Sequence, residues 1–112
     1  MHRVAACPPE IAVVPVVAVE KNTQTQKNTG AAEAFSELVE IVRRLRAPDG
    51  CPWDREQTHE TLKPFLIEEA YEAIDAINRN QAEDLREELG DVLLQIMLHS
   101  QIGAEQDGFD IA

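Results

Sequence analysis

The sequence predicts an all-α fold, a helical bundle built around an antiparallel helix hairpin. Apolar residues recur at three- and four-residue steps from residue 32 onward, as on the buried face of a helix. The same region has no alternating pattern that would favour a strand. The last two periodic segments are separated only by a short polar run at residues 78–81 (NRNQ), which is typical of a helix hairpin. The 112 residues have room for one domain with one modest core.

Residues 1–31 are expected to be a flexible N-terminal extension that precedes a single helical domain at residues 32–112. The segment at residues 11–19 is apolar, but it contains Pro15 and is too short to span a membrane. Residues 21–30 are polar and carry no packing pattern. The sequence therefore predicts no membrane-spanning segment before the domain, and at most a brief strand within the extension.

The first helix is predicted over residues 32–46 and is followed by a loop. Its apolar positions follow helical spacing, with charged residues between them: Phe35, Leu38, Val39, Val42 and Leu45. Pro48, Asp49 and Gly50 favour a turn after this helix. The loop is expected to continue to about Thr58.

Two longer helices are predicted over residues 63–78 and 82–104. Pro64 is compatible with the first of them if it lies in the first turn. Asp107 and Gly108 are expected to end the second. The predicted inner positions are Leu66, Ala70, Ala73, Ile74 and Ile77 on the first helix, and Leu85, Leu89, Val92, Leu93, Ile96, Ser100 and Gly103 on the second.

The charge balance excludes several function classes. Acidic residues number 21 against 10 basic ones, a net charge of -11, so nucleic acid is not expected as a partner. The two cysteines form no C-x-x-C and the three histidines are scattered, which argues against a zinc site and is consistent with the cytoplasm. An anionic substrate would need a divalent cation held by the surplus carboxylates.

Four carboxylates have the spacing of such a site. Glu69 and Glu72 lie on one face of the predicted helix at residues 63–78, and Glu88 and Asp91 lie on one face of the next. The pairs Glu72–Glu88 and Glu69–Asp91 share a midpoint at residue 80, inside the polar break. Because residues with a common midpoint lie at one level of an antiparallel hairpin, we expect the four side chains to meet.

Carboxylates brought together in this way repel one another and should have raised pKa values. A hard divalent cation relieves this repulsion, and a site with oxygen ligands only favours Mg²⁺ or Mn²⁺. The Glu-x-x-His pairs of di-iron bundles do not occur on either helix. The alternative is an ordinary solvated acidic face, since this chain is rich in acidic residues throughout.

Four ordered motifs closely resemble the MazG family of nucleoside triphosphate pyrophosphohydrolases, within the all-α NTP pyrophosphatase superfamily. They are DGCPWD at residues 49–54, QT at 57–58, LIEEAYE at 66–72 and DLREELGD at 84–91. The resemblance covers about residues 35–109. It implies that Mg²⁺, with Mn²⁺ as the alternative, is held by Glu69, Glu72, Glu88 and Asp91.

The resemblance also suggests roles for two further residues. Glu68 would help to hold a second ion or orient the attacking water, as the catalytic residue. Trp53 resembles the family's loop tryptophan and is the candidate for substrate binding, although it could instead fasten the loop to the bundle. His99 is expected to be a packed, hydrogen-bonded histidine.

The implied reaction converts a nucleoside or deoxynucleoside triphosphate into the monophosphate and pyrophosphate. The resemblance further implies a homodimer or higher homo-oligomer, and the family's pattern continues into another helix, so the domain is expected to be incomplete at its C-terminus. The alternative function is a noncatalytic dimerisation or regulatory module that retains the acidic metal site. A phosphoribosyl-ATP or dCTP pyrophosphohydrolase is a neighbouring option, and no residue singled out above indicates a base preference.

Overall fold

The computed structural model describes residues 30–112, which fall into two compact units, residues 30–56 and residues 57–112. All regular elements of the described residues are helical, so the predicted all-α fold is confirmed. The extension expected at residues 1–31 lies outside the described residues, except that residues 30 and 31 already belong to the first helix. None of the described helices is long and apolar enough to cross a membrane.

The first unit contains helix α2 (Gly30–Leu45), which agrees with the helix predicted over residues 32–46. The turn after α2 is closed by a hydrogen bond from the Cys51 amide to the Leu45 carbonyl, 2.8 Å long. A Cβ atom on Gly50 would lie 2.2 Å from the Arg44 carbonyl oxygen. This turn therefore requires glycine at residue 50, where the backbone approaches the end of the helix.

The structure corrects the loop predicted up to residue 58, because residues 52–56 form the short helix α3 (Pro52–Glu56). Pro52 stands at the first helical position, where its fixed φ is suitable and its missing N–H is not needed. The Arg46 guanidinium donates a hydrogen bond of 2.7 Å to the Asp54 carbonyl oxygen. This bond fastens α3 to the segment that follows α2.

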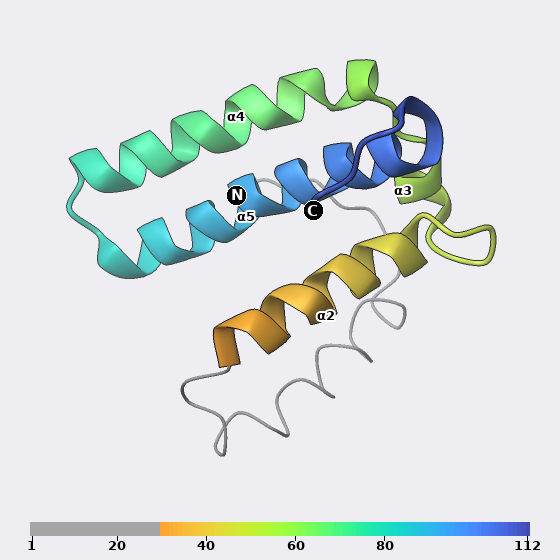
Figure 1. Ribbon diagram of the computed structural model, residues 1–112. Coiled ribbons are helices and arrows are strands. Elements are labelled where there is room, and N and C mark those ends of the chain that lie inside the picture. Colours follow the sequence, from red (N-terminus) through yellow and green to blue (C-terminus); the bar gives the residue numbers. More distant parts are fainter. Residues whose placement is uncertain (1–29) are drawn as a thin grey trace. The chain divides into compact units, whose positions relative to one another are not determined.

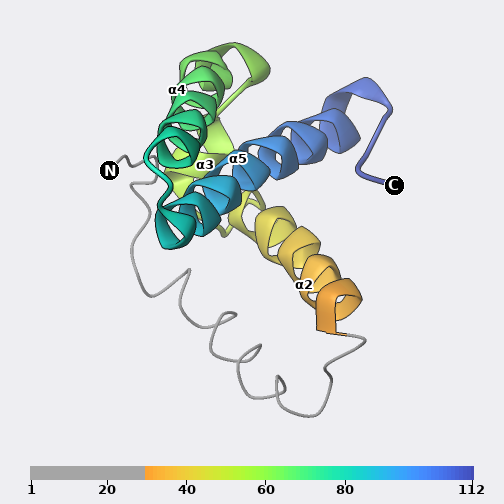
Figure 2. The same cartoon turned by 90° about the vertical axis from the view of Figure 1, so that its left-hand side faces the viewer.

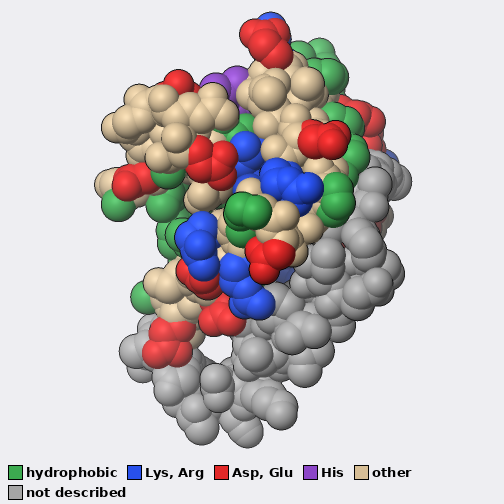
Figure 3. Space-filling model, turned by 90° about the vertical axis from the view of Figure 1, so that its right-hand side faces the viewer, with side chains coloured by type: hydrophobic (Ala, Val, Ile, Leu, Met, Phe, Trp, Pro, Cys, Tyr) green, Lys and Arg blue, Asp and Glu red, His purple; other side chains and the backbone are tan. Residues whose placement is uncertain are grey.

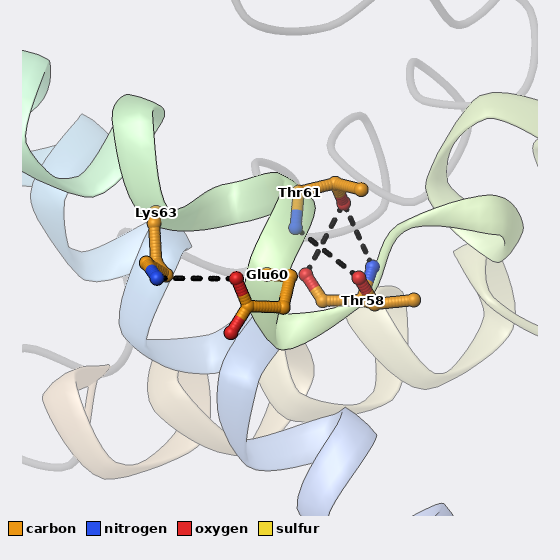
Figure 4. Close-up of polar contacts among 4 residues, drawn as sticks. All are labelled: Thr58, Glu60, Thr61 and Lys63. Carbon is orange, nitrogen blue, oxygen red and sulfur yellow. Dashed lines mark hydrogen bonds and ion pairs between the residues drawn. The ribbon is translucent and has the colours of Figure 1, made fainter.

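In the second unit, helix α4 (His59–Asn78) begins four residues before the predicted start. Thr58 caps it: the Thr58 hydroxyl accepts a bond from the Thr61 amide, and the Thr61 hydroxyl accepts one from the Thr58 amide (Figure 4). An ion pair of 3.1 Å between Lys63 and Glu60 lies in the same region. Pro64 was expected in the first turn of this helix. Because α4 begins at His59, Pro64 lies inside the helix instead.

Helix α5 (Ala82–Ile102) follows and runs back along α4, which confirms the predicted hairpin (Figures 1 and 2). Asn80 in the turn has a φ of 58°, a left-handed conformation that asparagine tolerates better than most residues. The Arg79 guanidinium bonds to Asp75 on α4 at 2.8 Å and to Asp84 on α5 at 3.1 Å. Arg79 therefore bridges the two helices at the turn.

The predicted inner faces of α4 and α5 are wrong at several positions. Ile74 and Ile77 on α4 are exposed, and so are Leu89 and Ile96 on α5. The buried residues are instead Leu62, Glu69, Ala73 and Ala76 on α4, and Gln95, Met97, Leu98 and Ile102 on α5. Glu69 and Gln95 thus share the interior with apolar side chains, because the covered face of each helix is rotated away from the stripe that apolar periodicity alone selects.

Beyond α5 the chain continues as one π-helical turn, η2 (Gly103–Asp107), where the sequence predicted a simple helix end. Gly108, with a φ of 83°, ends this turn in the left-handed conformation that favours glycine. A Cβ atom on Gly103 would lie 1.8 Å from the Phe109 ring, so the ring packs directly on the backbone of the turn. Single π-helical turns are frequently found at functional sites.

Candidate metal centre

Three of the four predicted carboxylate ligands come together across the α4–α5 hairpin. One carboxylate oxygen from each of Glu69, Glu88 and Asp91 lies within 4.8 Å of the other two. Glu69 is contributed by α4, and Glu88 and Asp91 by α5. The meeting expected from their common register is therefore observed, and we call these three residues with Glu72 the carboxylate cluster.

Glu69 is the buried member of the carboxylate cluster. Its side chain is 0% exposed, and neither carboxylate oxygen has a hydrogen-bond partner. Burial first, and then the charges of Asp91, Glu72, Glu88 and Glu68, together raise the pKa of Glu69 to about 7. A buried carboxylate without a partner is costly unless a cation accompanies it. Its two orphaned oxygens therefore fit a divalent cation.

Glu88 shows the same pattern to a smaller degree. Its Oε1 atom is buried and has no hydrogen-bond partner. Burial raises the pKa of Glu88, as do the charge of Glu72, a hydrogen bond with Glu72 and the charge of Asp91. Glu72 is therefore electrostatically part of the carboxylate cluster, although the set of mutually close oxygens does not include it. These are the hard oxygen donors that Mg²⁺ and Mn²⁺ accept.

The remaining two predicted site residues lie differently. Glu68 is exposed on α4 next to Glu69, and its charge contributes to the raised pKa of Glu69. Trp53 is half-buried on α3, in the unit formed by residues 30–56. The role of Trp53 in substrate binding stays a prediction.

A groove of about 570 Å³ adjoins the carboxylate cluster, a feature that was not predicted from the sequence. It extends from Glu72 and Glu88 to the hairpin turn, where Arg79 lies. Its full lining is Tyr71, Glu72, Asp75, Arg79, Asp84, Glu87 and Glu88. The signal available in the sequence was the helical spacing of Glu72, Asp75 and Arg79, which places them on one face.

Gln95 was also missed. It is 0% exposed on α5, and both atoms of its amide group lack a hydrogen-bond partner. Its position one helical turn after Asp91 was visible in the sequence, but the predicted inner stripe passed through apolar neighbours such as Ile96. A polar residue in register with the acidic ligands was the signal that could have identified it.

The raised pKa of Glu69 gives a pH dependence with a definite sign. Because the folded metal-free protein binds more protons than the unfolded chain between about pH 4.5 and 7, its stability should fall as the pH rises through that interval. A divalent ion must displace the Glu69 proton, so metal affinity should rise over the same interval. We expect the increase in melting temperature produced by Mg²⁺, relative to chelator, to grow from pH 5 to 7 and level off above. A metal effect independent of pH would contradict this assignment of Glu69.

Together, the fold and the carboxylate cluster define a class: an all-α protein whose helix hairpin carries an acidic candidate site for a divalent cation. Residues 57–112 match the family described as the MazG nucleotide pyrophosphohydrolase domain. That range contains all of α4 and α5 and the complete carboxylate cluster, whereas Trp53 precedes it. The chain belongs to this family, which confirms the resemblance seen in its motifs.

Individual relatives agree with this membership. The nucleoside triphosphate pyrophosphohydrolase/pyrophosphatase MazG of Thermotoga maritima is 57% identical over 77 residues, which cover 69% of this chain and 30% of that protein. The nucleoside triphosphate pyrophosphohydrolase of Escherichia coli K12 is 50% identical over 74 residues, 65% of this chain and 28% of that protein. The uncharacterized protein YabN of Bacillus subtilis is 41% identical over 113 residues, 91% of this chain and 23% of that protein. The chain thus spans less than a third of the length of these relatives.

Proposed function

We propose that the protein is a divalent-metal-dependent nucleoside triphosphate pyrophosphohydrolase. It would cleave nucleoside and deoxynucleoside triphosphates between the α and β phosphorus atoms, with Mg²⁺ as cofactor and Mn²⁺ as the alternative. The observation that carries the proposal is the carboxylate cluster, with three mutually close ligands from two helices and two orphaned oxygens on Glu69. Family membership and the activities that two relatives are named for support the same reaction class.

In this proposal the cluster residues Glu69, Glu72, Glu88 and Asp91 hold the cation. A bound divalent cation shields the triphosphate, lowers the pKa of a water molecule and stabilises the leaving pyrophosphate. A protein with a net charge of -11 needs such a cation before it can bind a polyanion. The cluster would therefore invert the local charge where the phosphates bind.

Glu68 is the proposed catalytic residue. It is exposed beside the cluster, where its carboxylate can orient the attacking water and accept its proton. The water oxygen then bonds to the α phosphorus, and the bond from that phosphorus to the bridging oxygen breaks. The products are the nucleoside monophosphate and pyrophosphate, with the released proton passing to solvent.

Oligomeric state, compartment and the contribution of Trp53 are part of the same proposal. The exposed apolar side chains of Ile67 and Ile74 on α4, and of Leu89 and Ile96 on α5, support a homodimer or higher homo-oligomer. We place the protein in the cytoplasm, where its nucleotide substrates occur. Trp53 would contact the nucleotide, and the domain would comprise residues 32–112 after an N-terminal extension.

The direct test is pyrophosphate release from a panel of nucleoside triphosphates by the purified chain, with Mg²⁺ and with chelator. The molar mass of the active species is measured in the same samples. We expect release that requires the metal. Binding of Mg²⁺ without any release would contradict the enzyme and favour the alternative, a noncatalytic dimerisation or regulatory module that keeps the acidic site.

A further inference from the structure

Buried polar atoms without hydrogen-bond partners also occur on the helix hairpin outside the carboxylate cluster. Among the described residues, every buried side-chain nitrogen or oxygen without a hydrogen-bond partner belongs to one of four residues: Glu69, Glu88, Gln95 and His99. The first two belong to the carboxylate cluster. Gln95 and His99 do not, and an amide buried without partners is unfavourable unless a ligand completes its hydrogen bonds.

Gln95 and His99 continue the helix face on which the carboxylate cluster lies. Asp91, Gln95 and His99 follow one another at four-residue steps on α5, so they project from the same side. At a rise of 1.5 Å per residue they lie about 6 and about 12 Å from Asp91 along the axis. The face therefore continues from the carboxylates away from the hairpin turn.

The hydrogen bonds of His99 determine which kind of group its free nitrogen can bind. Asp107 Oδ2 lies 2.9 Å from His59 Nε2, and a carboxylate only accepts, so this His59 nitrogen carries a proton. His59 Nδ1 lies 2.8 Å from His99 Nδ1, a contact that needs one donor and one acceptor. With both rings neutral, His59 Nδ1 accepts, His99 Nδ1 donates, and His99 Nε2 is left with a lone pair.

The outer end of this chain of hydrogen bonds is in contact with solvent, whereas its inner end is not. The side chains of His59 and Asp107 are 41% and 47% exposed, and Figure 3 shows histidine at the surface of the molecule. The Nε2 atom of His99 is buried. Burial and the neighbouring His59 lower the pKa of His99, which favours the neutral ring with a free acceptor.

The chemistry of this pair differs from that of the carboxylate cluster. Gln95 offers a neutral amide that both donates and accepts, and neutral His99 offers an acceptor. Neither side chain supplies the cationic donor that phosphate oxygens prefer. A nucleobase edge carries neutral donors and acceptors together, which is the complement of this pair.

We infer that Gln95 and His99 form the subsite that binds the base edge of the nucleotide, on the part of α5 beyond Asp91. This inference rests on the proposed function for the identity of the substrate. It assigns the phosphates to the carboxylate cluster and the base to two neutral side chains further along the same helix face. Asp107 and His59 act as positioning residues, because they fix the ring tautomer of His99.

Gln95→Leu tests the subsite, since it removes the amide and keeps an apolar side chain of similar size. Calorimetry with Mg²⁺ compares an α,β-methylene nucleoside triphosphate with inorganic tripolyphosphate, which has no base. We expect the variant to bind the nucleotide analogue roughly ten-fold more weakly and tripolyphosphate as the unaltered protein does. Gln101→Leu, the same change on the same helix, should alter neither affinity.

Three results would overturn the inference. The variant could lose affinity equally for the nucleotide analogue and for tripolyphosphate, it could keep its affinity for both, or the unaltered protein could fail to bind the analogue. Because the analogue cannot be cleaved between its α and β phosphorus atoms, binding is measured independently of turnover. A protein that releases no pyrophosphate but still shows the difference would refute the proposed function alone. If Gln95→Leu fails to fold, Asp107→Ala provides the test, because Asp107 is exposed. This variant should bind the analogue about three-fold more weakly and bind tripolyphosphate as the unaltered protein does. The absence of that difference would count against the subsite.

Discussion

Glu69→Gln is expected to abolish metal-dependent pyrophosphate release and to raise the melting temperature of the metal-free protein. The substitution keeps the shape of a side chain that is 0% exposed and removes its charge. Loss of a metal ligand removes several kcal/mol of transition-state stabilisation, so turnover should fall roughly 10³-fold or more. The pKa of Glu69 is raised from an ordinary 4.5 to about 7 by burial and by the neighbouring carboxylates, which together cost the ionised side chain roughly 3 kcal/mol at pH 8. A neutral glutamine does not carry this cost.

The two effects are measured on the same samples, as pyrophosphate release with Mg²⁺ and as thermal unfolding in chelator at pH 8. Glu60→Gln is the matched control, because Glu60 lies on the same helix in an exposed ion pair with Lys63. The control should change neither quantity appreciably. Retained turnover in Glu69→Gln would remove this residue from the metal site, and a loss of helicity would make it a structural residue instead.

Glu68→Gln is expected to lower kcat by roughly 10²–10⁴-fold while Mg²⁺ binding remains. Glu68 is exposed, so its carboxylate can be removed without leaving a buried charge unpaired. The expected loss comes from the water that this carboxylate would orient and deprotonate. The combination of slow turnover and retained metal binding distinguishes Glu68 from Glu69, which should lose both.

Calorimetry measures the affinity of Glu68→Gln for Mg²⁺, and steady-state kinetics measure its kcat. Both values are compared with those of the unaltered protein. Glu83→Gln serves as control, since Glu83 is exposed on α5 and forms an ion pair with Arg86. If kcat stays within about three-fold of the unaltered protein, Glu68 does not act in proton transfer. If metal binding disappears together with turnover, Glu68 belongs among the ligands.

The register of the site could be predicted from the sequence because, in an antiparallel helix hairpin, the position of the turn determines which residues lie at the same level. Once the polar run at residues 78–81 is taken as the turn, the antiparallel geometry places Glu69 level with Asp91 and Glu72 level with Glu88. The observed proximity of Glu69, Glu88 and Asp91 follows from this arithmetic and from helical periodicity. The hairpin and the all-α fold class were predictable for the same reason.

Burial could not be predicted in the same way, because it depends on which face of each helix the tertiary structure covers. Glu69 and Gln95 occupy interior positions, while Ile74 and Ile96 are exposed. Apolar periodicity alone predicts the reverse arrangement. A site that needs desolvated polar groups violates the ordinary pattern of a core, so errors of this kind are expected where function is located.

Local details were missed for a different reason. The early start of α4 depends on the reciprocal hydrogen bonds of Thr58 and Thr61, a cap in which threonine stands where glutamate or glutamine is usual. The π-helical turn after α5 depends on the Phe109 ring packing against Gly103. The histidine pair likewise joins residues 59 and 99, which are distant in sequence and showed no shared pattern.

Diffraction from crystals of the chain soaked in Mn²⁺, recorded at the manganese absorption edge, would locate the cation directly. We expect an anomalous peak among the carboxylate oxygens of Glu69, Glu88 and Asp91, with Glu72 beside it, and no such peak in Glu69→Gln. A peak elsewhere, or none at saturating Mn²⁺, would contradict the assignment of this cluster as the metal centre.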